Sequence, residues 1–383
     1  MERNEDVCKR VRQQQMRRLK KEKRIRCAII AVVIIIVIAI AAVAAVKLLG
    51  SSGDKSKAKN KKTHTAGNIV QTAGDMPQTA GEISDEDNKD DGKKSDTKSA
   101  SGKFKNVKYP KRADNYTDIL SENVLSPYVA LVDVNNNEVI AGKSYDARIY
   151  PASMTKVMTL IVAVENIKSL DDTFTMTTEM IDPLVRAGAS RAGFDPGESV
   201  TAKDMLYGLI LSSGADAAVG LSNLVAGSEE NFVKMMNDKC EEIGLKNTHF
   251  MNTSGLHDEN HYTTPVEMAM ILEYALSNET CAEILGTYQY TTAATPQHPE
   301  GLVLSSTLFS RMVGDEVSGV KIIGGKTGYT TEAGNCLVSC AERGNDRYIA
   351  VTAGAGNRWN VVFDDFELYG NFIPNPPGYV KQQ

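Results

Sequence analysis

The chain has 383 residues and a formal net charge of −5 at neutral pH, and its length suits two or three domains. The charge is uneven, because residues 1–26 contain 11 basic and 4 acidic side chains, whereas residues 107–383 contain 20 basic and 35 acidic ones. An acidic body excludes nucleic acid as a partner, since phosphate groups require a basic surface. Six cysteines are too few for a disulfide-stabilised scaffold.

The first predicted element is a transmembrane helix over residues 27–49. Residues 27–46 form a run of 20 residues without a charge. A helix of that length spans about 30 Å, the thickness of a hydrocarbon core. The basic segment 1–26 precedes the helix and marks the cytoplasmic side, so we expect a single-pass cell-membrane protein with an extracytoplasmic body. The alternative is a cleavable signal peptide, which has a shorter apolar region and for which the small residues at 41–45 would offer a cleavage site.

The remaining chain divides by composition into three parts. Residues 50–106 are rich in Ser, Lys, Asp, Gly and Thr and are predicted to be a disordered linker, because they cannot bury enough apolar surface to offset the entropy of ordering. Residues 107–370 have an ordinary apolar content and are long enough for one large core or two lobes. Residues 371–383 are a short Pro-rich tail.

Strand patterns occupy both ends of the folded domain. Residues 128–134 and 138–141 flank an Asn-rich turn and predict a β-hairpin. Residues 336–340 and 348–352 predict a second hairpin.

Helical patterns lie between the two hairpins. Ser153–Ile167 is apolar on nearly all sides, which is typical of a helix buried at the centre of a domain. Residues 203–225 and 229–243 predict amphipathic helices. Strands at both ends with helices between them indicate an α+β fold, with an antiparallel sheet flanked by helices and a mainly helical lobe.

The motif Ser153-Met-Thr-Lys156 opens the buried helix. A spacing of three places the hydroxyl and the ammonium on one helix face, and the free N–H groups of the first turn can face a developing oxyanion. A lysine in a closed site loses proton affinity and can then act as a base. The alternative is a chance match, since Ser-x-x-Lys occurs on many helices.

Two further motifs have a possible chemical role. Gly325-Lys326-Thr327-Gly328-Tyr329 lies at the start of, or within, a strand, and its glycines allow a substrate backbone to approach while Lys and Thr suit a carboxylate. Ser212–Asp216 follows a helical run and is predicted to form the loop that ends it. The alternatives are a basic turn and a simple Ser-Gly helix cap.

The order Ser-x-x-Lys, Ser-Gly loop, Lys-Thr-Gly is that of serine β-lactamases and penicillin-binding proteins. On these motifs, residues 110–370 resemble the penicillin-binding D-alanyl-D-alanine carboxypeptidases of serine type. Longer stretches match the same family, namely EIGLKNTHF at 242–250, NTSGLH at 252–257 and KTGYTTEAGN at 326–335. The resemblance implies a β-lactamase/transpeptidase-like fold.

The resemblance also implies an activity and its nucleophile. The chain would remove the terminal D-Ala from peptidoglycan stem peptides on the cell-wall side of the membrane, and β-lactam antibiotics would be covalent inhibitors. Ser153 would form the acyl-enzyme, Lys156 would take its proton, and Ser213 would help pass that proton to the leaving D-Ala. The resemblance implies no metal and no cofactor.

Substrate-binding residues follow from the same resemblance. Lys326 and Thr327 would bind the terminal carboxylate beside Gly328, and Arg358 would be a second carboxylate contact. The N–H groups of Ser153 and Tyr329 would form the oxyanion hole, whose donors are typically worth about 3 kcal/mol each.

The chain departs from the family at one position. The middle motif of the family is usually Ser-x-Asn, and Ala215 stands at its third position, so we expect Asp216 or a water to replace the missing amide. A catalytically weak penicillin- or peptidoglycan-binding module is therefore one alternative. A β-lactamase is another, but it needs a carboxylate for deacylation, and the sequence around Glu241 and Glu242 matches the carboxypeptidases.

Two histidines superficially resemble a zinc motif. His257 and His261 are four residues apart. The zinc-protease motif requires Glu directly after the first His and a helical setting, whereas Asp258 follows His257 in a predicted loop. We therefore expect no metal at this pair.

Overall fold

The computed structural model describes residues 103–120, 122–314 and 316–374. The predicted basic segment, the transmembrane helix and nearly all of the linker lie outside these residues, as does most of the tail. Within the part of the chain that is described, no helix has the length and apolar character needed to cross a membrane.

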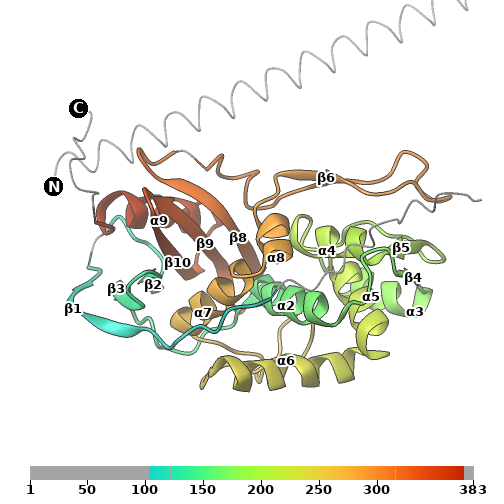
Figure 1. Ribbon diagram of the computed structural model, residues 1–383, viewed down its shortest axis with the longest axis horizontal. Coiled ribbons are helices and arrows are strands. Elements are labelled where there is room, and N and C mark those ends of the chain that lie inside the picture. Colours follow the sequence, from blue (N-terminus) through green and yellow to red (C-terminus); the bar gives the residue numbers. More distant parts are fainter. Residues whose placement is uncertain (1–102, 121, 315, 375–383) are drawn as a thin grey trace, which may run out of the picture. The chain divides into compact units, whose positions relative to one another are not determined.

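A six-stranded sheet is the main element of the fold (Figure 1). Its spatial order is β1-β3-β2-β10-β9-β8, and neighbouring strands are antiparallel except for the parallel edge pair β1 and β3. The strands are β1 Lys111–Asp118, β2 Tyr128–Asp133, β3 Glu138–Lys143, β8 Lys321–Thr330, β9 Gly334–Arg343 and β10 Asp346–Ala355. Both predicted hairpins are confirmed, as β2–β3 and β9–β10.

The sheet is antiparallel, as predicted, except at one edge. Strand β1 pairs parallel to β3, with Lys111 opposite Glu138. The sequence of β1 does not indicate a strand, because most of its side chains are polar and exposed and only Ala113 is fully buried. An edge strand of this kind lacks the apolar alternation that identifies strands.

Helices cover both faces of the sheet. The side chains of strand β2 alternate between the two faces. Val129 and Leu131 belong to the core under α9 (Arg358–Asn371), whereas Ala130 and Val132 belong to the larger core that contains α2 (Lys156–Asn166) and α7 (Pro265–Leu276). A strand buried on both faces forms a continuous apolar run, and residues 129–132 are such a run.

The helical lobe lies beside the sheet (Figure 1). It is built around η1 and α2, which together correspond to the predicted buried helix. Its elements are η1 Ala152–Thr155, α2 Lys156–Asn166, β4 Thr173–Thr175, α3 Thr178–Arg186, β5 Ser199–Thr201, α4 Ala202–Ile210, α5 Ala215–Ala226, α6 Glu229–Ile243, α7 Pro265–Leu276, α8 Glu279–Leu285, β6 Gln289–Thr291 and β7 Val303–Ser305. Every residue of α2 from Lys156 to Val164 is buried, which confirms that this helix is central. The α+β architecture with a flanked sheet is therefore confirmed.

The pattern over residues 203–225 corresponds to two helices, not one. Helix α4 ends at Ile210 and α5 starts at Ala215. Between them Ser213 has a left-handed backbone with φ of 56°, which a continuing α-helix does not allow. The predicted loop at 212–216 is present only over residues 211–214, because Ala215 and Asp216 already belong to α5, and the loop brings Ser213 to Lys326 of β8. Helix α6 has the predicted bounds of 229–243.

Candidate active site

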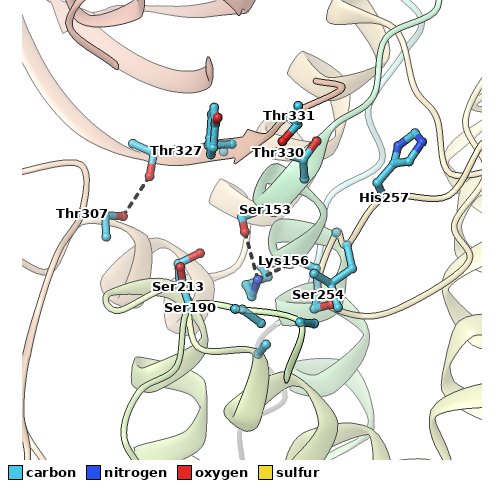
Figure 2. Close-up of a pocket in the computed structure, with 18 of the residues that line it drawn as sticks. Ser153, Lys156, Ser190, Ser213, Ser254, His257, Thr307, Thr327, Thr330 and Thr331 are labelled. Atoms are coloured by element: carbon cyan, nitrogen blue, oxygen red, sulfur yellow. Dashed lines mark hydrogen bonds between the residues drawn. The ribbon is translucent and has the colours of Figure 1, made fainter. Parts of the chain in front are cut away.

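A hollow of about 410 Å³, here called the first hollow, lies between the helical lobe and strand β8 (Figure 2). Three of the segments that line it are distant in sequence and carry the predicted motifs. Ser153 and Lys156 come from η1 and the start of α2, Ser213 comes from the loop between α4 and α5, and Thr327–Tyr329 come from β8. The structure therefore brings all three predicted motifs together.

Ser153 and Lys156 are hydrogen-bonded to each other. Lys156 Nζ lies 3.1 Å from Ser153 Oγ and donates a second hydrogen bond, of 2.6 Å, to the carbonyl oxygen of Ser254. Burial lowers the pKa of Lys156 to about 7, while the negative charge of Asp216 opposes this effect. A substantial fraction of Lys156 is therefore neutral at physiological pH, so its amine can accept the proton of Ser153.

Lys326 lies behind the surface of the first hollow and holds Ser213. Its Nζ donates to Ser213 Oγ and to the carbonyl oxygen of Thr327, at 2.9 Å each. Burial lowers the pKa of Lys326 well below its usual value, and the charges of Lys156 and Arg311 lower it further. Ser213 is thus fixed by a hydrogen bond from β8 and by its left-handed backbone, a conformation that is common at functional sites.

The carboxylate-binding end of the first hollow contains an arginine that the sequence did not single out. Arg311 lines the hollow together with Thr307, whose hydroxyl accepts a 3.0 Å hydrogen bond from Thr327. Arg358 does not line it, and its guanidinium lies 5.8 Å from the centre of the Trp359 ring. The positive charge beside Thr327 is therefore that of Arg311.

A sequence signal for Arg311 does exist. The residue is a lone cation in the run from Leu308 to Met312, in which Leu308, Phe309 and Met312 are buried. A single charge in a short apolar run indicates a site residue only when a neighbouring strand is known to pass beside that run. A surface loop shows the same pattern, so the sequence alone does not identify Arg311.

Two glycines allow the close packing around Ser153. A side-chain carbon on Gly328 of β8 would lie 3.2 Å from the backbone nitrogen of Ser153, so the strand runs directly beside the nucleophile. A side-chain carbon on Gly255 would lie only 1.9 Å from the carbonyl oxygen of Ala152. The turn that presents Ser153 is therefore held between β8 and the loop around Gly255.

Asp216 supports one wall of the first hollow. Its carboxylate accepts hydrogen bonds from the backbone N–H groups of Ala192, Gly193, Phe194 and Ala217, at 2.7–3.2 Å. The segment 187–190, just before these residues, lines the hollow, and Asp216 itself does not. The carboxylate is thus engaged by the wall segment and does not take the place of an amide at the position of Ala215. The other alternative, a water at this place, stays a prediction.

The two histidines of the superficial zinc motif have separate partners. His261 Nδ1 accepts from the backbone N–H of Met251, so its proton is on Nε2, which lies 2.7 Å from Thr155 Oγ1. His257 packs edge-on against Tyr150. In residues 103–120, 122–314 and 316–374, no group of three or more His, Cys, Asp or Glu side chains is arranged to hold a metal ion.

Solved structures with this fold share a quarter or more of their aligned residues with this chain. The Streptomyces K15 DD-transpeptidase has a TM-score of 0.57 and 28% identity, over 64% of this chain and 96% of the other. A D-alanyl-D-alanine carboxypeptidase of Mycobacterium tuberculosis H37Rv has a TM-score of 0.56 and 25% identity, over 72% of this chain and 97% of the other. Fold and site thus define a transpeptidase-like protein of the penicillin-binding class.

Sequence comparison narrows this class to a family. Residues 117–357 match the S11 peptidases, the D-alanyl-D-alanine carboxypeptidases, and the chain belongs to this family. It is similar to DacF of Bacillus subtilis (strain 168), with 37% identity over 225 residues, 59% of this chain and 56% of that protein. It is also similar to DacC of Escherichia coli (strain K12), with 31% identity over 241 residues, 59% of this chain and 55% of that protein. The chain spans little more than half the length of these curated relatives.

Proposed function

We propose that this chain is a serine D,D-carboxypeptidase that removes the terminal D-Ala from peptidoglycan stem peptides through an acyl-enzyme on Ser153. One observation carries this proposal. Lys156 is buried, has a pKa near 7 and lies 3.1 Å from the hydroxyl of Ser153. An amine that is neutral near physiological pH and in contact with a serine is the arrangement that activates a nucleophile.

In the acylation step, Ser153 Oγ attacks the carbonyl carbon of the penultimate D-Ala, and its proton passes to Lys156 Nζ. The N–H groups of Ser153 and Tyr329 stabilise the oxyanion. The C–N bond then breaks, and the proton passes from Lys156 by way of Ser213 to the amine of the leaving D-Ala. Water next attacks the ester, which releases the shortened peptide and restores the hydroxyl of Ser153.

The substrate carboxylate would bind at the other side of the scissile bond. Thr327 and Arg311 line this end of the first hollow, and Lys326 lies directly behind Thr327. The positive charge of Arg311 would attract a terminal carboxylate to an otherwise acidic domain, and the hydroxyl of Thr327 would donate a hydrogen bond to it. In this proposal Arg311 takes the place given to Arg358 by the sequence.

Labelling with a fluorescent penicillin tests the nucleophile. The native chain should form a stable covalent adduct, and Ser153→Ala should form none. The absence of labelling in the native chain would contradict the proposal and favour the weak binding module that Ala215 suggests. Rapid turnover of a chromogenic cephalosporin would indicate a β-lactamase instead.

We further propose that the chain is anchored in the cell membrane by residues 27–49, with a cytoplasmic N-terminus and the folded domain on the cell-wall side. The support is the uncharged run of 20 residues at 27–46 and the basic segment before it. Residues 50–106 would then act as the linker between the membrane and the folded domain.

A further inference from the structure

The loop at residues 252–256 supplies the backbone acceptor that orients Lys156. The carbonyl oxygen of Ser254 accepts the 2.6 Å hydrogen bond from Lys156 Nζ, which also lies 3.1 Å from Ser153 Oγ (Figure 2). A neutral amine has two N–H groups and one lone pair. With one N–H directed to Ser254, the lone pair can face the hydroxyl of Ser153. The place of this carbonyl therefore sets the direction in which the base acts.

Helix α6 holds this loop through one carboxylate. Glu229, the first residue of α6, accepts hydrogen bonds from the backbone N–H and from the hydroxyl of Thr253, at 2.9 and 2.6 Å, and both end on Oε1. The carbonyl oxygen of Thr253 accepts a 2.7 Å hydrogen bond from the hydroxyl of Thr159 in α2. Thr253 is completely buried. The N–H, the hydroxyl and the carbonyl of the residue before Ser254 are therefore all engaged.

Asn252 fixes the internal shape of the loop. Its side-chain oxygen accepts hydrogen bonds from the backbone N–H groups of Ser254 and Gly255, at 3.2 and 2.7 Å. These contacts join residues of the same loop, so they do not place it against the rest of the domain. The hydrogen bonds of Glu229 and Thr159 tie the loop to α6 and α2.

Glu229 lies away from the reacting groups. It lines neither the first hollow nor a second hollow, of about 460 Å³, at the start of β9 and the end of β10. Both of its hydrogen bonds to Thr253 come from neutral donors. The oxygen of a neutral amide can accept the same two bonds, so the loop needs an acceptor at this place and not a charge.

We propose that Glu229 is a positioning residue for the base of the reaction. Through Thr253 it holds the carbonyl of Ser254 at the place where that carbonyl orients the amine of Lys156. This inference rests on the proposed function, which gives Lys156 the role of base. A change at Glu229 should slow the transfer of the proton from Ser153 without altering the surface that binds the substrate.

Stopped-flow acylation by penicillin tests this role in Glu229→Ala. Measurement over a range of penicillin concentrations gives the acylation rate constant and the noncovalent dissociation constant separately. The rate constant should fall about tenfold, because small displacements of a reacting group are costly, while the dissociation constant should change by less than about twofold. Glu229→Gln should restore the rate to within about twofold of the native value, because its amide oxygen can accept both hydrogen bonds.

Glu230→Ala is the matched control. Glu230 is the next residue in the first turn of α6, so both side chains share the favourable interaction of a negative charge with the start of a helix. Glu230 is exposed, and its replacement should leave the acylation rate unchanged. An equal loss in Glu230→Ala and Glu229→Ala would show that the charge at the start of α6 matters and would overturn the inference.

Thr253→Val is a second test that keeps the shape of the side chain. It removes the hydroxyl bond to Glu229 and keeps the N–H bond, so acylation should slow about threefold, as for the loss of one hydrogen bond. The double variant with Glu229→Ala should be no slower than Glu229→Ala alone, because both substitutions act on one contact. An unchanged rate in Thr253→Val, or losses that multiply in the double variant, would overturn the inference.

Thermal unfolding separates positioning from stability alone. A Glu229→Ala chain that is less stable but acylated at the native rate would show that Glu229 only stabilises the loop, and this result would overturn the inference. So would failure of Glu229→Gln to restore the rate. The proposed function is judged on the native chain. Absence of acylation there would contradict both proposals, whereas native acylation with an undiminished rate in Glu229→Ala would contradict only this one.

Discussion

Lys156 has to lose its proton near neutral pH to activate Ser153, and its environment accounts for this loss. It is fully enclosed at the start of α2, where burial disfavours the ammonium form. The negative charge of Asp216 limits the shift, so that the pKa stays near 7 rather than falling further. Burial of Lys156 and the charge of Asp216 thus set the pH at which the nucleophile becomes active.

The pH dependence of acylation follows from this pKa. Because the neutral amine is the active form, the rate of penicillin acylation should rise as pH increases through about 7 and level off above pH 8. Stopped-flow measurement between pH 5.5 and 9 checks this expectation. A rate that is flat across the range, or that falls from pH 6 to 8, would exclude Lys156 as the base.

Asp216→Asn should lower both the free energy of unfolding and the pKa of Lys156. The amide oxygen can replace only part of the carboxylate that accepts four backbone N–H groups, so the free energy of unfolding should fall by about 1–3 kcal/mol. Loss of the negative charge should also move the inflection of the acylation profile below pH 7, because that charge raises the pKa of Lys156.

The exposed Asp171→Asn is the control for Asp216→Asn, and it should leave both quantities unchanged. A destabilised Asp216→Asn chain whose inflection does not move would show that the role of Asp216 is only structural.

At the scale of elements, the site depends on how closely the η1 turn is enclosed. Gly255→Ala would place a methyl group against the carbonyl oxygen of Ala152, with no flexible side chain to give way. We expect at least about a tenfold loss of penicillin acylation, because small displacements of a nucleophile are costly.

Gly227→Ala is the matched control for this effect. Gly227 has φ of 74°, close to the 81° of Gly255, but no atom lies within 4 Å of the added carbon. Both variants therefore share the backbone strain, and only Gly255→Ala has the clash. Equal losses of acylation in the two variants would contradict the packing account.

The sequence predicts those elements whose buried side chains form a regular apolar pattern. Helix α2, α6 and both hairpins follow from apolar periodicity and turn residues, and the family resemblance located the three motifs. Strand β1 did not follow, because an exposed edge strand has no apolar alternation. The loop after α4 was predicted, but the left-handed backbone of Ser213 was not, because a left-handed serine has no local signature. Tertiary packing determines both.

Arg311 shows the same limit of local sequence patterns within the site. The sequence places Arg358 near the end of the last strand, but its actual position at the start of α9 leaves it outside the first hollow. Arg311 reaches the hollow because the chain after β7 passes beside Thr327. Such a neighbour is set by the path of the chain, which no local spacing reveals.

At the scale of the whole molecule, the proposed anchor and the folded domain are separable. Deleting residues 1–50 should give a soluble protein that is labelled by penicillin at the same rate as the full chain, because every residue that lines the first hollow lies between 153 and 332. Fractionation of cells that express both forms, followed by labelling, measures this. A shortened chain that stays with membranes after a salt wash would argue against the anchor at 27–49.

The central claim is that the chain releases D-Ala by way of Ser153, and a direct assay on a pentapeptide ending in D-Ala-D-Ala tests it. The native chain should release one D-Ala per peptide, and Ser153→Ala should release none while remaining folded. Undiminished release by Ser153→Ala, or no release by a native chain that is acylated by penicillin, would contradict the account.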